Sequence, residues 1–132
     1  MSNAAANKQL LQSAFAEMAK GNTKPFVDTW ADDFCWNCIG TTKWSGTFRG
    51  KQAVLNDLFK PLSEKFASRY TNSAQRFVAE DDVVVVECRG NVMMKSGARY
   101  DNTYCFVCRF EGGKMRELTE YLDTELVTAA IV

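Results

Sequence analysis

The most constraining feature of this chain is a change in the period of its hydrophobic pattern at Arg69. Before it, apolar residues recur at three- and four-residue steps, as in Leu11, Phe15 and Met18, and that period predicts helices. After it, apolar and polar residues alternate in four runs, which predicts strands. Helices followed by a strand meander predict an α+β fold, with the helices packed on one face of a curved antiparallel sheet. Short turn sequences separate the four runs, which are 69–79, 83–95, 99–110 and 114–126.

The first half of the chain is expected to form three helices. The first ends at Gly21, and the second carries Trp30 and Phe34 on one apolar face. The third covers residues 51–66, and Pro61 should kink or end it because proline lacks the backbone donor of a helix interior. Between the second and third helices the sequence predicts a short extended run at 35–40. A loop with several glycines follows at 40–50.

Length and composition limit the classes of function. A chain of 132 residues predicts one domain, 1–132. Sixteen basic residues balance sixteen acidic ones, so no net charge favours nucleic acid as a partner. No segment reaches the ~20 consecutive apolar residues of a membrane helix, and residues 1–12 lack the pattern of a secretory signal. Together with an odd number of cysteines, five, these features predict a cytoplasmic protein without a membrane partner.

Several short motifs, in their order along the chain, resemble one known family. The most informative pair is 113–115, Gly-Lys-Met, followed by 120–123, Glu-Tyr-Leu-Asp. With three further segments they make the chain similar to SnoaL-like proteins of the nuclear-transport-factor-2-like superfamily. That resemblance implies a cone-shaped curved sheet wrapped around the helices, with a pocket at the open end. The further segments are Ala-Asp-Asp-Phe at 31–34, the two-glycine stretch 46–55, and Tyr-Asp-Asn-Thr-Tyr at 100–104.

Ketosteroid isomerases of this superfamily offer one catalytic template. Their general base, oxyanion-binding acid and oxyanion-binding tyrosine correspond here to Cys38, to Phe106 and to a position near Ala14 or Phe15. None of these residues can perform the corresponding step. The resemblance therefore does not extend to steroid isomerase chemistry.

Limonene-epoxide hydrolases of the superfamily offer a second template, an acid–arginine–acid trio on neighbouring strands. Those positions hold Glu87, Arg89 and Glu120 in this sequence. Strand alternation is expected to bring the trio together inside the cone beside Asn102 and Tyr104. One carboxyl of such a trio would have a raised pKa and could move a proton, with Glu120 as the acid/base and Arg89 orienting it. The alternative is a static ion-pair network that closes the pocket floor.

The pocket is expected to have an aromatic wall with a few polar groups, as small-molecule sites do. Asn102 and Tyr104 would hydrogen-bond the substrate. The reaction would be cofactor-free, of isomerase, cyclase or hydrolase type, and it would proceed without histidine, which this sequence lacks. Two alternatives stay open, a non-catalytic ligand-binding protein and a protein-interaction domain in which the aromatics fill the cavity. The predicted wall and substrate-contacting residues are Trp36, Cys38, Asn102, Tyr104, Phe106 and Leu122.

Two Cys-x-x-Cys pairs occur, Cys35 with Cys38 and Cys105 with Cys108. Zinc sites place such pairs on tight turns that direct both sulfurs to one point. These pairs lie in extended runs, where residues three apart face opposite sides. The sequence therefore predicts no metal site and buried cysteines that pack as small apolar residues.

The strands also predict an assembly. A strand face that carries Val84, Val86, Cys105 and Val107 is too apolar to be left in water. We expect a homodimer formed by packing of sheet against sheet.

Overall fold

A curved six-stranded sheet organises the part of the chain that the computed structural model describes, residues 3–132. The strand order is β2-β1-β6-β5-β4-β3, and neighbouring strands are antiparallel except β1 and β6, which are parallel. The prediction of a wholly antiparallel sheet is therefore wrong at this one pairing. The strands are β1 Trp30–Cys38, β2 Gly46–Arg49, β3 Thr71–Glu80, β4 Val83–Asn91, β5 Thr103–Glu111 and β6 Lys114–Leu122.

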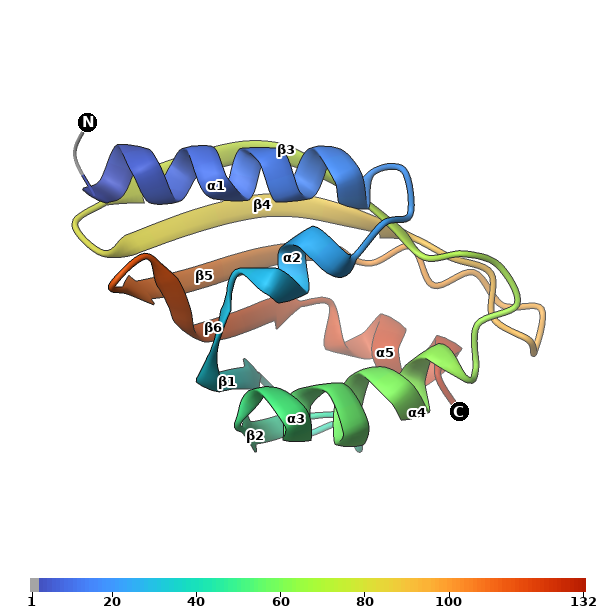
Figure 1. The fold of residues 1–132 in the computed structure, drawn as a ribbon. Coiled ribbons are helices and arrows are strands. Elements are labelled where there is room, and N and C mark those ends of the chain that lie inside the picture. The colour runs from blue at the N-terminus through green and yellow to red at the C-terminus, as the bar shows by residue number, and fades with distance from the viewer. Residues whose placement is uncertain (1–2) are drawn as a thin grey trace.

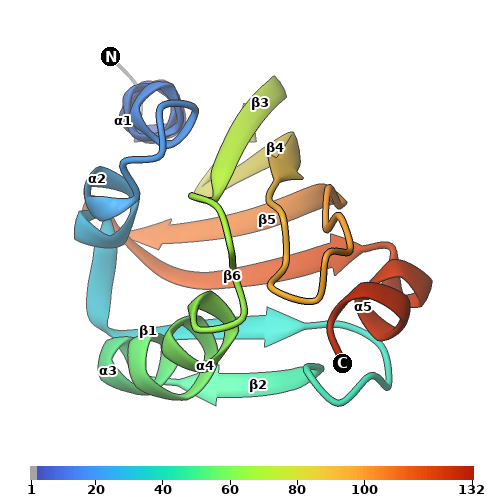
Figure 2. The same ribbon diagram turned by 90° about the vertical axis from the view of Figure 1, so that its right-hand side faces the viewer.

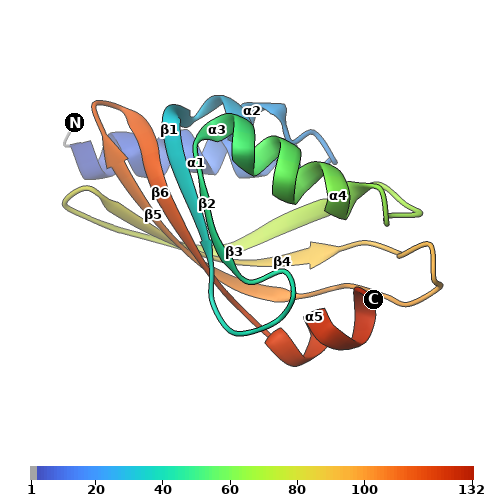
Figure 3. The ribbon, with the colours of Figure 1, turned by 90° about the horizontal axis from the view of Figure 1, so that it is seen from below.

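The helices lie at both ends of the sheet (Figures 1 and 2). Helix α1 packs on β3 and β4, and the helical segment that follows β2 packs beside β1 and β2. Helix α5 follows β6 and lies apart from the other helices (Figure 3). No helix of residues 3–132 has the length and apolarity needed to span a membrane. The helical elements are α1 Asn3–Met18, α2 Lys24–Asp28, α3 Lys51–Ala53, the π-helical η1 Val54–Phe59, α4 Lys60–Ser63 and α5 Thr124–Ala130.

Strand β1 corrects the prediction that Trp30 and Phe34 belong to a helix. Helix α2 ends at Asp28, and Trp30 already pairs with Met115 of β6. The register between β1 and β6 then shifts before Cys35. Residues four apart on a strand face the same side, and these two buried aromatic rings stack at 4.4 Å between ring centroids. A spacing of four residues therefore fits a strand as well as a helix.

The segment around Pro61 forms the predicted third helix in a modified form. It runs as α3, η1 and α4 from Lys51 to Ser63, with a π-helical turn just before the proline. Pro61 lies near the start of α4, inside this continuous helical segment and directly after its π-helical turn. The helix ends two residues after Pro61, as its sequence predicts.

The core lies on the concave face of the sheet. Val84 and Val86 of β4 are buried there, opposite Cys108 and Phe106 of β5. Cys105 and Val107 belong to the other, convex face. The prediction that the two valines share a face with Cys105 and Val107 is therefore wrong, because the register pairs them differently across β4 and β5.

The last strand is shorter than predicted, and a helix follows it. Asp123 follows β6 and caps α5, since its carboxylate accepts a hydrogen bond from the Leu126 backbone N–H at 3.2 Å. Val127 and Ile131 of this C-terminal segment then pack with Tyr100 in a second apolar cluster. This cluster covers the end of the sheet where β5 begins and β6 ends.

Asn102 ties these two strand ends together. It is fully buried, and its Oδ1 accepts hydrogen bonds from the backbone N–H groups of Thr103 at 2.8 Å and Asp123 at 3.2 Å. Its Nδ2 donates to the Asp123 carbonyl at 3.1 Å and to the Tyr100 hydroxyl at 3.2 Å. Every hydrogen-bonding atom of this amide therefore has a partner.

We expect Asn102→Ala to lower the free energy of unfolding by about 2–4 kcal/mol, because it leaves buried backbone and hydroxyl groups without partners. Urea denaturation measures this change. Asn91→Ala is the matched control, since Asn91 is exposed at the end of β4, and it should change stability by less than about 0.5 kcal/mol. Equal stability of the two variants would contradict the role given to Asn102.

Candidate functional site

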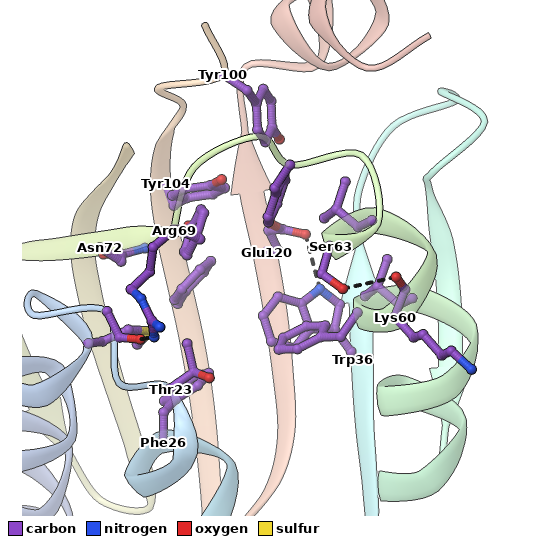
Figure 4. Close-up of a pocket in the computed structure, with 18 of the residues that line it drawn as sticks. Thr23, Phe26, Trp36, Lys60, Ser63, Arg69, Asn72, Tyr100, Tyr104 and Glu120 are labelled. Atoms are coloured by element: carbon purple, nitrogen blue, oxygen red, sulfur yellow. Dashed lines mark hydrogen bonds between the residues drawn. The ribbon is translucent and has the colours of Figure 1, made fainter. Parts of the chain in front are cut away.

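A cavity of about 500 Å³ opens between the concave face of the sheet and the helices. This volume lies in the range of small-molecule sites, roughly 300–1,000 Å³. Its walls come from β1, β5 and β6, from the segment η1–α4, and from the loop that joins α4 to β3. Figure 4 shows side chains from these elements directed toward one space.

Glu120 of β6 is the acid of this cavity. Its carboxylate accepts a hydrogen bond from the Trp36 indole N–H at 3.0 Å. Among residues 3–132 no basic side chain forms an ion pair with it. Burial raises the pKa of Glu120 above its usual range, and the indole N–H opposes that rise only in part. The site therefore favours the protonated acid more than water does.

Cys38 lies beside this carboxyl, since it is the register partner of Glu120 across the parallel β1–β6 pair. Burial, followed by the adjacent Glu120 charge, raises the pKa of the Cys38 thiol to about 12. The thiol is therefore protonated at neutral pH and acts as a weak donor. Cys38 thus lies next to Glu120 on the neighbouring strand but does not line the cavity itself.

Three tyrosines, Tyr70, Tyr100 and Tyr104, face the cavity. Burial raises the pKa of Tyr104 well above its usual range and that of Tyr100 to about 12. It also raises the pKa of Tyr70. All three hydroxyl groups are therefore protonated at neutral pH, which makes them hydrogen-bond donors rather than bases.

Two buried asparagines hold the tyrosines in place. Asn102 donates to the Tyr100 hydroxyl, and Asn72 of β3 donates to the Tyr70 hydroxyl at 3.1 Å. The hydroxyl groups of Tyr104 and Tyr70 also interact, and each affects the pKa of the other. These contacts fix the direction of the phenol groups before a ligand enters. Together with Glu120 they form a polar strip in a largely aromatic cavity.

The predicted trio does not assemble. Glu87 lies on the convex face, where it pairs with Arg76 at 2.8 Å, and Arg89 is exposed on the same strand. Glu120 lies on the concave face opposite Phe106. The physical reason is the strand register. Glu87 pairs with Cys105, which directly precedes Phe106. Because adjacent residues of a strand point to opposite faces, Glu87 lies on the convex face and Glu120, the partner of Phe106, on the concave face.

The other predicted site residues divide into two groups. Trp36, Tyr104 and Phe106 line the cavity with Glu120. Cys38, Asn102 and Leu122 do not line it. Asn102 affects the cavity only indirectly, by its hydrogen bond to the hydroxyl of the lining residue Tyr100. Leu122 packs between the two apolar clusters.

Sequence reasoning missed eight polar residues of the wall: Thr23, Lys60, Ser63, Ser68, Arg69, Tyr70, Asn72 and Tyr100. Tyr100 had a usable signal, because it shares the strand parity of Tyr104. Tyr70 and Asn72 are likewise two residues apart at the start of β3. Arg69 had no signal, because its place on the cavity depends on how the loop after α4 returns to the sheet.

The cysteine pairs do not form a metal cluster in the described part of the chain, where no group of three or more potential ligands converges. Cys35 and Cys105 lie partly exposed, whereas Cys38 and Cys108 are buried. In each pair the two side chains thus differ in environment, as expected on an extended strand.

Comparison with known proteins agrees with this architecture. A family model described as a SnoaL-like domain matches residues 11–118. Curated protein sequences give no significant match.

Solved structures with the same fold cover nearly the whole chain. An NTF2-like protein from Burkholderia xenovorans is 26% identical, with 98% of each chain covered and a TM-score of 0.73. An NTF2-like protein from Burkholderia thailandensis is 20% identical over 96% of this chain and 97% of its own, with a TM-score of 0.81. A putative SnoaL-like polyketide cyclase from Jannaschia is 18% identical over 99% of this chain and 94% of its own, with a TM-score of 0.78. With a cavity on the concave face of a curved sheet and a family match over most of its length, the chain belongs to the SnoaL-like family of the nuclear-transport-factor-2-like fold.

Proposed function

We propose that the cavity binds a small, largely apolar molecule with a polar oxygen group, and that Glu120 transfers a proton to or from it without a cofactor. One observation carries this proposal. A carboxyl group faces a ligand-sized cavity, has a raised pKa and has no basic ion-pair partner among residues 3–132. A structural acid in such a place would be expected to have a paired base. Proton transfer, in contrast, requires a carboxyl whose pKa lies closer to neutrality.

The surrounding groups support acid/base work on an oxygen-bearing substrate. The protonated phenols of Tyr100 and Tyr104 can donate hydrogen bonds to a substrate oxygen on which negative charge develops. The Trp36 indole N–H binds Oε1 of Glu120 and so orients the carboxyl in the cavity wall. Isomerisation, cyclisation and addition of water all use this combination of an acid/base and oxygen-directed donors.

A non-catalytic binding role is the second candidate. The same hydrogen bonds that orient Glu120 and the tyrosines would also fix the polar end of a ligand that is only bound. A polar strip that is already ordered lowers the entropic cost of binding in either case. Turnover of a substrate separates the two roles, since binding alone does not require Glu120 to exchange its proton.

The raised pKa of Glu120 predicts a pH-dependent effect on stability. A buried acid whose folded-state pKa lies above its unfolded-state value costs stability as pH rises through these two values, and the full cost is present above the folded-state pKa. Glu120→Gln removes this cost. We therefore expect the melting temperature of Glu120→Gln, relative to wild type, to be higher at pH 8 than at pH 4. Melts at both pH values measure it, and a pH-independent difference would show that Glu120 titrates as it does in water.

A chromogenic substrate tests proton abstraction without knowledge of the natural substrate. Ring opening of a nitrobenzisoxazole needs only one base in an apolar pocket. We expect wild-type protein to accelerate it, with a rate that rises with pH as Glu120 ionises, and Glu120→Gln to lose the acceleration by about 10²-fold or more. Glu87→Gln is the matched control, because Glu87 lies on the convex face, and it should retain the wild-type rate. Equal rates for Glu120→Gln and wild type would exclude Glu120 as the base.

We also propose a homodimer formed through the convex face of the sheet. A row of residues on four adjacent strands, Val78, Val85, Val107 and Thr119, crosses this face. Val78 is 51% exposed, and Tyr121 on the same face is 47% exposed. Apolar surface of this kind favours association.

The dimer proposal predicts the effect of one substitution. Val107→Lys places a charge in the middle of the row and should shift the protein to monomer in sedimentation equilibrium at micromolar concentration. Lys114→Glu, at the exposed start of β6, is the control. Wild-type protein that sediments as a monomer would contradict the proposal.

The cysteines support a reducing, cytoplasmic location, which we propose on that basis. All five thiols are free, and Cys38, Cys88 and Cys108 are buried. Proteins with free thiols and no disulfide are typical of reducing compartments.

A further inference from the structure

Arg69 holds an unusual position at the edge of the cavity. It lies in the loop between α4 and β3, and its guanidinium donates to the Gly21 carbonyl at 3.1 Å. Gly21 has φ +88°, and a Cβ on it would collide with Cδ of Arg69. The arginine stem therefore rests directly on the glycine backbone. This contact and the Nη1 hydrogen bond hold the exposed Arg69 side chain at the edge of the cavity.

The guanidinium has unused capacity. Arginine carries five N–H donors, and only Nη1 of Arg69 makes a hydrogen bond within residues 3–132. In the same part of the chain no carboxylate pairs with Arg69. Its other donors remain available to a molecule that enters the cavity.

The charges around the cavity are not balanced. Lys60, Arg69 and Glu120 are its charged lining residues. Figure 4 shows the Lys60 amine directed away from the cavity, whereas Arg69 lies against its wall. Within residues 3–132 Glu120 forms no ion pair with Arg69, and its carboxyl accepts a hydrogen bond from the Trp36 indole instead.

A hydroxyl group completes the arrangement. Thr23 lines the cavity on the same side as Arg69, and Glu120 with Trp36 lies on the other side (Figure 4). The Thr23 hydroxyl makes no capping hydrogen bond to α2. Arg69, which binds the Gly21 carbonyl, and Thr23, two residues after Gly21, thus both line the cavity.

We propose that Arg69 and Thr23 form a subsite for a carboxylate on the ligand, which makes the ligand an apolar, ring-sized carboxylic acid. This inference rests on the proposed function, since it uses the same cavity. The planar guanidinium fork matches a carboxylate. The ligand's rings occupy the aromatic space, and its opposite end reaches Glu120. The carboxylate is not the reacting group but the group that orients the molecule.

A matched pair of probes tests the subsite. β-Naphthoate and β-naphthamide have the same rings and nearly the same shape, and they differ in charge. We measure the dissociation constant of each by titration calorimetry at pH 8. We expect wild-type protein to bind the carboxylate about tenfold or more tightly than the amide, as charge-assisted hydrogen bonds allow.

Variants assign that preference to its source. Arg69→Met should abolish the preference for naphthoate while naphthamide binding is retained, and Arg69→Lys should keep part of it. Lys60→Met is the control for a positive charge at the edge of the cavity, and Arg89→Met is the control for the net charge of the protein. Both variants should keep the full preference for naphthoate over naphthamide. Thermal melts of all variants show whether each is folded, and Arg69→Lys supplies the comparison if Arg69→Met unfolds.

The outcomes separate this inference from the proposed function. Equal affinity of wild-type protein for the two probes overturns the carboxylate subsite but leaves an apolar cavity with Glu120. A preference that survives Arg69→Met, or that is lost in Lys60→Met, also overturns it. Failure of both probes to bind contradicts the ligand cavity and, with it, the subsite.

Discussion

The parallel pairing of β1 with β6 is the interaction on which the site depends. It joins a strand from the first third of the chain to the last strand, and it sets Cys38 beside Glu120. The same pairing brings the Trp36 indole within 3.0 Å of the Glu120 carboxyl. If β6 instead ended the sheet as an edge strand, Glu120 would face water with an ordinary pKa. Its unusual chemistry therefore comes from a contact between distant parts of the sequence.

Much of the fold could be predicted because local patterns are strong in this chain. Four alternating runs became β3 to β6, and the periodic runs became α1 and the segment α3–η1–α4. The parallel pairing could not be predicted, because the local sequence pattern does not determine which edge strand of the β3–β6 meander an earlier strand will pair with. The bulge in β1 also could not, because Trp30 and Phe34 have the spacing of a helix. The spacing of apolar residues identifies a secondary-structure element only where no other type of element allows the same spacing.

The candidate site shows the same limit more sharply. Alternation correctly separates Glu87 and Arg89 from Val86 and Cys88 along β4. It does not say which of these two sets faces the helices. The register with β5 decides this, and it places Val86 opposite Phe106 on the concave face. Glu120 could be singled out from the sequence, but its supposed partners could not, because a trio on three strands requires two registers to be correct at once.

Loss of the trio changes the chemistry that the site can offer. An acid paired with arginine would have a lowered pKa and would remain a carboxylate at neutral pH. Glu120 instead has an indole N–H, a thiol and a buried aromatic wall around it. These neighbours stabilise its charge only weakly, so the energies of its two protonation states lie closer together than in water. An acid/base group benefits from that balance, since it must give and take a proton in one cycle. The arginine next to this cavity, Arg69, stands on the opposite wall, where its charge can hold a ligand without fixing the protonation state of the acid.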